Sequence, residues 1–423
     1  MPAGGTATRA VLANDNISVD LRDTATGIVP RIQQNSRETL MHTNAYLENG
    51  YDRRRFIERT VASGAAAALL PLQTTLAQNT PAQPRTVNDV IRDAMQHAPL
   101  SMLFQGRTAD ECQAWQRAFR SRLTQLLGDS TPPAQWTTVV EDRAEFDDHI
   151  RHQLLLKSAG VPSLPVYLLV PRSLSAGQRA PGVLCVHGHG AYGNETVVGR
   201  SDLEGVAANI KKNNYDYGLQ FVRRGYVVAA PCMIPFGRRV DRQRYGGNDP
   251  CAVSFVRMQS IGRLPITENL RDLRWSINLL QSQSQVHGDR IGCAGLSYGG
   301  RMTMMVSALD QRIRVASVSG ALNLLQERMT LRHSCGSQMI PNLLKYGDYS
   351  EIGSLIAPRP CVWETGSTDP LIVPKWDEVF RNRLRRAYTA LDADDQLHFD
   401  KFTGGHVWSG RIAFPLFDKV LKS

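Results

Sequence analysis

The chain has 423 residues, of which 42% are hydrophobic and 21% are charged, as in ordinary globular proteins. This composition excludes an intrinsically disordered chain, a coiled coil and a collagen-like fibre. No apolar run reaches the roughly 20 residues that a membrane-spanning helix needs. The 49 Lys and Arg residues exceed the 39 Asp and Glu residues and give a net charge of +10. Because the basic residues are spread along the chain without a nucleic-acid-binding motif, we expect no nucleic-acid partner.

The first 77 residues resemble a leader followed by an export signal. Residues 53–57 are three arginines, Phe and Ile, and a weakly apolar, alanine-rich run from Val61 to Leu76 precedes Gln78. A basic region, an apolar region and a small-residue cleavage site are typical of signal peptides, and the adjacent arginines are typical of the twin-arginine type. We therefore predict that residues 1–40 are untranslated or disordered and that 41–77 are removed. The mature protein is then periplasmic or secreted, without stable membrane insertion.

Residues 78–134 are predicted to form a helical N-terminal extension, because apolar residues recur at helical spacing between Val87 and Leu127. Residues 135–423 are predicted to form one catalytic domain. Short apolar runs predict its strands at 136–140, 150–156, 164–170, 182–186, 226–230, 291–294, 315–318, 361–364 and 399–402. Helical segments separate the later runs. The predicted fold class is therefore α/β, with a mostly parallel sheet of about eight strands and helices on both faces.

A serine on a sharp turn is the strongest functional signal. The strand predicted at 291–294 runs into Gly295-Leu296-Ser297-Tyr298-Gly299, and a helix follows. A nucleophilic serine between a strand and a helix needs tiny residues two positions away on each side, so that strand and helix can approach. Gly295 and Gly299 meet this requirement. An incidental glycine turn is the alternative, but the strand before and the helix after argue against it.

A serine nucleophile needs a base, and the base needs an acid that orients it. Asp369 follows the strand at 361–364, and His406 follows the last strand in a glycine-flanked loop. Both lie after Ser297, in the chain order that an α/β-hydrolase requires. Glu364 is the nearby competitor for the acid, but it lies within its strand. His398 lies before the last strand, at the opposite end of the sheet.

The strand at 182–186 opens into a loop, His187-Gly188-His189-Gly190, that is suited to bind an oxyanion. Acyl transfer builds negative charge on the carbonyl oxygen, and backbone N–H groups must stabilise it. The N–H groups of Tyr298 and His189 are the two candidates. The two histidines of this loop, spaced i, i+2 without a carboxylate partner, are weak evidence for a metal, so we expect no metal and no organic cofactor. The seven cysteines show no metal-binding spacing. Three of them, Cys185, Cys293 and Cys361, lie in predicted strands, where thiols usually act as small buried hydrophobic residues. Any disulfide would therefore have to form between loop cysteines.

Together these four motifs resemble the α/β-hydrolase superfamily, in its bacterial dienelactone-hydrolase-like and acetylxylan-esterase-like branch. The resemblance covers roughly residues 135–423. It implies Ser297 as nucleophile, Asp369 as acid, His406 as base, and Tyr298 and His189 as oxyanion donors. Dienelactone hydrolases carry a cysteine nucleophile, so the serine of this chain argues against that activity.

The predicted function is hydrolysis of carboxylic esters through an acyl-enzyme, most specifically removal of acetyl groups from a carbohydrate such as xylan. Arg238 and Arg239, in a long insert between the strand at 226–230 and Ser297, are candidate substrate-binding residues, although they could equally pair with surface carboxylates. A serine peptidase or amidase of the prolyl-oligopeptidase type is an alternative, because the segment around Ser297 also resembles that family. A non-catalytic binding protein on the same fold is a third hypothesis. The partner is a small or carbohydrate ester, and the sequence does not give the oligomeric state.

Overall fold

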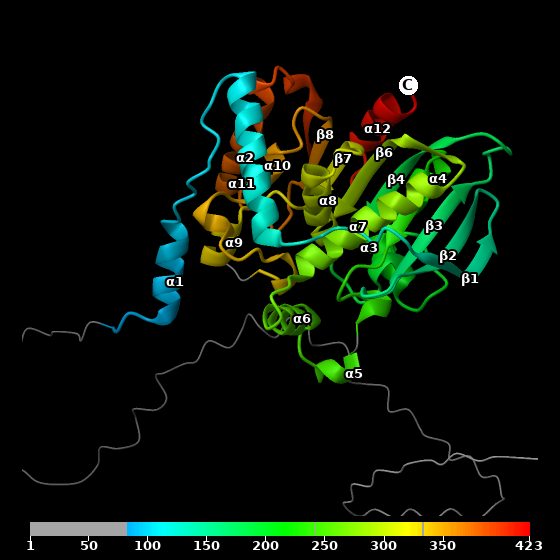
Figure 1. Ribbon diagram of the computed structural model, residues 1–423, viewed down its shortest axis with the longest axis horizontal. Helices are drawn as coiled ribbons and strands as arrows, with labels where there is room; N and C mark the ends of the chain where they lie inside the picture. The colour runs from blue at the N-terminus through cyan, green and yellow to red at the C-terminus, as the bar shows by residue number, and fades with distance from the viewer. Residues whose placement is uncertain (1–82, 241, 332–333) are drawn as a thin grey trace, which may run out of the picture. The chain divides into compact units, whose positions relative to one another are not determined.

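The computed structural model describes residues 83–240, 242–331 and 334–423 (Figure 1). The predicted leader and signal therefore lie outside the described residues. Within this part of the chain, nine strands form one sheet in the order β1-β2-β3-β5-β4-β6-β7-β8-β9. The strands are β1 (Thr137–Glu145), β2 (His149–Lys157), β3 (Leu164–Pro171), β4 (Ala180–Val186), β5 (Val227–Pro231), β6 (Val286–Leu296), β7 (Ile313–Ser319), β8 (Cys361–Gly366) and β9 (Leu397–Phe402).

The sheet is mostly parallel, which confirms the predicted fold class. Strands β5, β4, β6, β7, β8 and β9 run parallel to one another, whereas β1, β2 and β3 form an antiparallel meander. The meander joins the same sheet because β3 pairs antiparallel with β5, from Val166 opposite Pro231 to Leu169 opposite Val228. The sheet thus has nine strands rather than about eight. Strands β2 and β3 form a hairpin, with Leu156 opposite Leu164.

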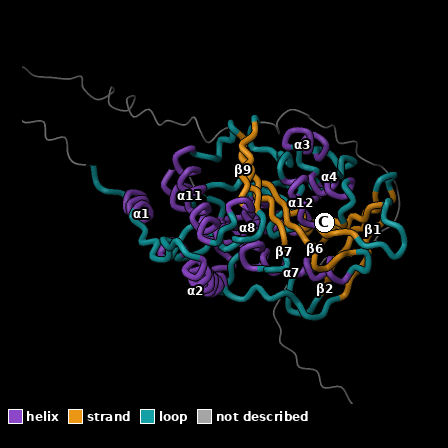
Figure 2. Tube along the Cα trace, turned by 90° about the horizontal axis from the view of Figure 1, so that it is seen from above, coloured by secondary structure: helices purple, strands orange, loops and turns teal. Residues whose placement is uncertain are grey.

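Helices cover both faces of the sheet (Figure 2). Helices α7 (Pro265–Ser282) and α8 (Tyr298–Leu309) pack on one face, and α4 (Tyr217–Arg223) and α12 (Ala413–Leu421) pack on the other. Alternate residues of a strand point to opposite faces. On β4, Leu184 and Val186 therefore join the core beneath α7 and α8, whereas Val183 and Cys185 join the core beneath α4 and α12. This two-sided burial explains why the central strands are continuous apolar runs.

The predicted extension forms two helices, α1 (Val87–Gln96) and α2 (Ala109–Leu127). Each begins at a threonine capping box, in which the cap hydroxyl accepts a hydrogen bond from the third helical N–H. Helix α2 buries Phe119, Leu123 and Leu127 in the same hydrophobic core as the sheet and α7. Helix α2 is therefore packed as an integral part of the hydrolase fold.

The remaining helices are α3 (Val206–Asn213), α5 (Arg242–Tyr245), α6 (Pro250–Gln259), α9 (Leu325–Leu331), α10 (Tyr349–Ser354) and α11 (Pro374–Ala390). Helices α5 and α6 lie in the insert between β5 and α7, and α9 lies in the segment between β7 and β8. Both segments follow the carboxyl ends of strands, which is the edge where α/β folds bind ligands.

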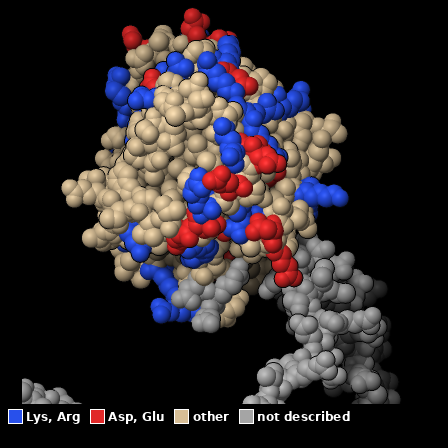
Figure 3. All heavy atoms as spheres, turned by 90° about the vertical axis from the view of Figure 1, so that its right-hand side faces the viewer, with Lys and Arg blue, Asp and Glu red and all other residues tan. Residues whose placement is uncertain are grey.

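Charges of both signs are mixed on the face of the molecule near β1, where Figure 3 shows Lys and Arg interspersed with Asp and Glu. Arg143 and Arg172 both pair with Glu145 there, and Arg238 pairs with Glu141. The excess of basic residues therefore does not form one continuous patch on this face. Among the described residues, no helix combines the length and the apolar character needed to cross a membrane.

Candidate active site

Ser297 lies at the tip of the turn between β6 and α8, with φ 64° and ψ −121°. A non-glycine residue rarely adopts a positive φ, and the surrounding structure must hold it there. The Ser297 N–H donates to the Ser319 carbonyl at 2.8 Å, and its own carbonyl accepts from the Arg301 N–H at 3.0 Å. The turn predicted around this serine is therefore present, with the side chain half-buried at the carboxyl end of β6.

Two glycines make this turn possible by allowing three backbone segments to touch. A Cβ at Gly299 would lie 1.9 Å from the Val186 carbonyl oxygen, and one at Gly295 would lie 2.5 Å from the carbonyl group of Gly299. Contacts this short cannot be relieved by side-chain rotation because the opposing atoms are backbone. The requirement for glycine at both positions, inferred from the sequence, is thus explained by the approach of α8 to β4 and β6.

Asp369 and His406 meet across the loops that follow β8 and β9. The Nδ1 atom of His406 lies 2.7 Å from Oδ2 of Asp369. The other carboxylate oxygen of Asp369 accepts the Leu371 N–H at 2.8 Å, so the buried carboxylate is held on both sides. The two loops are joined by the Thr368 N–H, which donates to the Gly404 carbonyl at 2.9 Å. This pairing brings together two residues that are 37 positions apart in the chain.

The second ring nitrogen of His406, Nε2, has no hydrogen-bond partner within the described part of the chain. A histidine that acts as a general base needs a ring nitrogen that is free to accept a proton. The hydrogen bond between Ser297 and His406 therefore stays a prediction; such bonds are often long before substrate binds. Gly320, with φ 61°, gives the imidazole its space, because a Cβ there would lie 2.7 Å from His406 Cε1. This glycine was not among the residues predicted for the site.

Glu364, the competing acid, binds a different part of the same loop. Its carboxylate accepts the N–H groups of Gly410 at 3.0 Å and Ser409 at 3.4 Å. Burial raises the pKa of Glu364 to about 7, with the nearby Asp400 adding to the increase. Glu364 therefore supports the loop that carries His406, whereas Asp369 is the carboxylate in contact with the imidazole.

The two predicted oxyanion donors flank Ser297. The Tyr298 N–H belongs to the first turn of α8, where backbone donors lack helical acceptors and the helix dipole favours negative charge. His189 follows β4, and it lines the same small cavity as Ser297 and Tyr298. Both residues thus lie on the segments that border Ser297.

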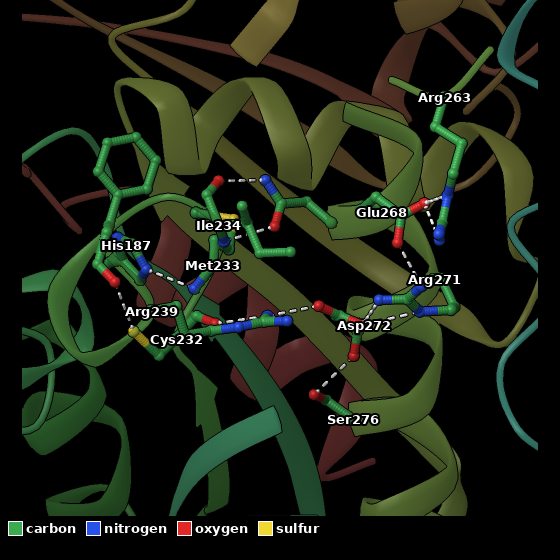
Figure 4. Close-up of polar contacts among 12 residues, drawn as sticks. His187, Cys232, Met233, Ile234, Arg239, Arg263, Glu268, Arg271, Asp272 and Ser276 are labelled. Atoms are coloured by element: carbon green, nitrogen blue, oxygen red, sulfur yellow. Dashed lines mark hydrogen bonds and ion pairs between the residues drawn. The ribbon is translucent and has the colours of Figure 1, made fainter. Parts of the chain in front are cut away.

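His187, the other histidine of this loop, has a structural contact on each nitrogen. Its Nε2 accepts the Met233 N–H at 2.8 Å (Figure 4), and Nδ1 lies 2.7 Å from the Gly188 carbonyl. Complete burial lowers the pKa of His187 to about 4, so the ring is neutral at physiological pH. His187 therefore connects the His189 loop to the segment after β5.

A buried hydrogen-bond network beneath Ser297 was not predicted from the sequence. The amide of Asn269, on α7, donates to the Tyr298 hydroxyl at 2.9 Å and to the Ile234 carbonyl at 2.7 Å. The Tyr298 hydroxyl in turn donates to the Ser337 carbonyl at 3.1 Å. Tyr298 thus joins α7, α8 and the segment before β8, which fixes the backbone next to Ser297.

The cavity at Ser297 has a volume of about 60 Å³ and a strongly polar wall. Arg301 lies in this wall with its guanidinium buried: it donates to Asn323 Oδ1 at 2.5 Å and stacks 3.5 Å above the Tyr349 ring. Burial lowers the pKa of Arg301 to about 10, and the side chain remains charged at neutral pH. The cavity is lined by His189, Ser297, Tyr298, Arg301, Gly320, Ala321, Asn323, Arg328, Gln338 and Leu371. The segment between β7 and β8 therefore forms a wall of the site.

The structure does not bring Arg238 and Arg239 to this cavity. They line a separate hollow of about 410 Å³ with Leu155, Pro165 and Ile234. Arg238 forms an ion pair with Glu141, and Arg239 forms one with the buried Asp272 on α7 (Figure 4). These are the carboxylate pairings that the sequence left open as the other possibility.

A group of three soft metal-binding side chains also borders the site. One side-chain donor atom each of His189, Cys251 and Cys335 lies within 4.8 Å of the other two. The expectation of no metal rested on the two histidines of the 187–190 loop and on the lack of a metal-binding spacing among the cysteines. Cys251 and Cys335 are 84 positions apart, so no local spacing reveals that they meet near His189.

Comparison with known proteins agrees with this fold. The sequence profile of the Abhydrolase family matches residues 85–403. The chain belongs to the Abhydrolase family. YtaP of Bacillus subtilis (strain 168), which is named as a hydrolase, is 30% identical over 296 residues, covering 68% of this chain and 92% of that protein.

Two solved structures share the fold. A protein of Bacteroides fragilis NCTC 9343, named as an acetyl xylan esterase, superposes with a TM-score of 0.63 at 19% identity, covering 75% of this chain and 82% of that one. A glucuronoyl esterase from Solibacter usitatus gives a TM-score of 0.54 at 12% identity, covering 75% and 94%. The predicted resemblance to the α/β-hydrolase superfamily is confirmed.

Proposed function

We propose that this Abhydrolase family member is an exported serine esterase that removes short acyl groups, acetyl above all, from carbohydrates. The observation that carries the proposal is the Asp369–His406 pair, which leaves Nε2 of the imidazole free at the carboxyl edge of the sheet that presents Ser297. Export is inferred from residues 41–77 alone. The esterase names of the structural relatives agree with the reaction, although the likeness itself concerns the fold.

In the proposed mechanism, His406 Nε2 takes the proton of the Ser297 hydroxyl as the oxygen attacks the ester carbonyl. Asp369 holds Nδ1–H and stabilises the imidazolium that forms. The N–H groups of Tyr298 and His189 stabilise the oxyanion; loss of one such donor typically costs about 3–4 kcal/mol in the barrier. The imidazolium then protonates the departing alcohol. Water hydrolyses the acyl-enzyme with His406 again acting as base.

The preference for a short acyl group follows from the wall of the cavity. Its volume is about 60 Å³, and Arg301, Asn323 and Gln338 supply polar atoms to it. A long alkyl chain placed there would remove polar and charged groups from water without giving them hydrogen bonds, which is costly. An acetyl group is small enough to avoid this cost, and hydroxyl-rich sugars can hydrogen-bond with the polar rim.

The test is hydrolysis of p-nitrophenyl acetate by the purified chain and by Ser297→Ala and His406→Ala. We expect each variant to lose a factor of roughly 10³ or more in kcat. Ser284→Ala and His398→Ala are matched controls, because Ser284 lies between α7 and β6 and His398 lies at the opposite end of β9 from His406. Equal activity in the parent and both site variants would show that Ser297 and His406 are not the nucleophile and base.

Substrate range is tested with acetylated xylo-oligosaccharides, p-nitrophenyl esters of increasing acyl length and p-nitroacetanilide. We expect rates to fall from acetate to octanoate, and the anilide to be cleaved far more slowly than the acetate. Comparable cleavage of the anilide would favour a peptidase or amidase. A folded parent that turns over none of these compounds would favour a binding protein.

A further inference from the structure

Three segments that are remote in the sequence place soft donor atoms at one point beside the active site. His189 comes from the loop after β4, Cys251 from the first turn of α6, and Cys335 from the residue before a short turn of helix at Gly336–Gln338. One donor atom from each lies within 4.8 Å of the other two. None of these side chains has a role in the mechanism proposed above, in which His189 acts only through its backbone N–H.

Backbone packing brings the two cysteines together. A Cβ at Gly336 would lie 2.7 Å from Cβ of Phe255 and 3.0 Å from the carbonyl oxygen of Cys251. Helix α6 and the segment at Cys335 are therefore in direct backbone contact. Cys251 is buried, and Cys335 is partly exposed. The contact requires a glycine beside Cys335, so the close approach of the two thiols is built into the fold.

His189 is an exposed residue, but two aromatic rings lie against its imidazole. Its ring centre lies 5.0 Å from that of Tyr298 and 5.3 Å from that of Phe236, and the Phe236 ring is nearly perpendicular to it. Two aromatic rings thus restrict the imidazole. This ordering favours metal binding, because less side-chain freedom remains to be lost.

The chemistry of the three side chains suits a metal cation. A cation stabilises the thiolate form of cysteine, and a neutral imidazole supplies a nitrogen lone pair. Two thiols and one imidazole within reach of one point are therefore a suitable ligand set for a metal that prefers sulfur and nitrogen.

We propose that His189, Cys251 and Cys335 form a Zn²⁺ site. Zinc accepts this mixture of thiolate and imidazole at about 2.3 Å to sulfur and about 2.0 Å to nitrogen. In tetrahedral geometry these bonds place the donors about 3.5–3.8 Å apart. Separations of at most 4.8 Å therefore require movements of about 1 Å or less by each side chain. Three protein ligands leave the fourth position for water.

Zinc bound here would fix the loop that carries the oxyanion donor. The His189 side chain would be tied to α6 and to the segment before β8, and His189 also lines the Ser297 cavity. Metal binding at this site would thus order the His189 loop beside the Ser297 cavity. Its existence does not depend on the esterase reaction, so binding can be measured separately from activity.

The experiment uses the full chain, reduced, stripped with a chelator and titrated anaerobically with Zn²⁺ in competition with a chromophoric chelator. We expect one Zn²⁺ per chain, and with Co²⁺ a thiolate-to-cobalt charge-transfer band. Cys335→Ala and His189→Asn should weaken Zn²⁺ binding by more than the roughly 10–100-fold that loss of an outer-shell partner costs. Cys112→Ala is the matched control, because Cys112 is a buried thiol on α2 that contacts the Ala387 carbonyl. It should bind Zn²⁺ as the parent does.

A measurement on the parent alone covers the case in which a variant fails to fold. Zn²⁺ should slow alkylation of Cys251 and Cys335 but leave the reactivity of Cys112 unchanged. The proposal is overturned if the folded parent binds no stoichiometric Zn²⁺, or if folded Cys335→Ala binds it equally well. It is also overturned if the unreduced protein contains a Cys251–Cys335 disulfide and the reduced protein takes up no metal.

Discussion

Gly320→Ala tests whether the position of His406 controls catalysis. A Cβ at Gly320 would lie 2.7 Å from Cε1 and 3.0 Å from Nδ1 of the imidazole. Non-bonded carbons are most stable about 3.5–4.0 Å apart, so the ring must move by about 1 Å. Such a displacement of a catalytic group costs roughly 10²-fold in rate, equivalent to about 2.7 kcal/mol of barrier. We expect kcat for p-nitrophenyl acetate to fall by about this factor, with little change in KM.

The same substitution also strains the backbone, because φ of Gly320 is 61°. A side chain in this left-handed region costs about 1–2 kcal/mol of stability. Gly160→Ala is the matched control, since Gly160 has φ 76° in the β2–β3 hairpin and a Cβ there would have no atom within 4 Å. Both variants should unfold at lower urea concentrations than the parent, but only Gly320→Ala should lose activity. If Gly320→Ala retains more than half the parent rate, the assignment of His406 as the base is refuted.

Asp272→Asn should cost about 3–5 kcal/mol in urea unfolding, because it removes the carboxylate that pairs with two buried guanidinium groups, of which Arg239 keeps no other carboxylate partner among the described residues. Arg238→Gln, which removes only a partly exposed ion pair, should cost less than about 1 kcal/mol; a similar loss in both variants would contradict this expectation. Glu364 has a native pKa of about 7 and an ordinary value of 4.5, so the native state binds more protons between these pH values and stability falls as pH rises. Glu364→Gln removes this titrating group, so the variant should lack the loss of up to about 3 kcal/mol of stability that the parent shows between pH 4.5 and 7. The measurement is thermal unfolding of parent and variant at pH 5 and pH 8. Equal changes in melting temperature in the two proteins would show that Glu364 is not protonated in the native state. Arg301→Met replaces a charged side chain in the wall of the Ser297 cavity with an apolar one. The ratio of the rates of p-nitrophenyl butyrate and p-nitrophenyl acetate hydrolysis should therefore rise about 10-fold or more. An unchanged ratio would show that the acyl group does not bind against Arg301.

The amino-acid sequence by itself determined the features that depend on neighbouring residues. Continuous apolar runs such as Gly182–Val186 predicted buried parallel strands, because such strands are covered on both faces. The turn at Ser297 could be predicted because its glycines lie two positions away in the same segment. The chain order of Ser297, Asp369 and His406 then predicted which residues are the acid and the base, and the contact between Asp369 and His406 needed only that β8 and β9 be adjacent.

Tertiary structure decided what depends on contacts between remote segments. Gly320 and Asn269 carry no local signal, since their effects come from the imidazole and the tyrosine that pack against them. The sequence could not show that Arg301, rather than Arg238 or Arg239, lines the cavity at Ser297. All three arginines lie in segments that follow the ends of strands. The approach of Cys251 to Cys335 arises from the packing of α6 on Gly336. Local periodicity determines which faces of the helices and strands are buried. Contacts between side chains from remote segments form only in the folded chain, and the chemistry of this site depends on those contacts.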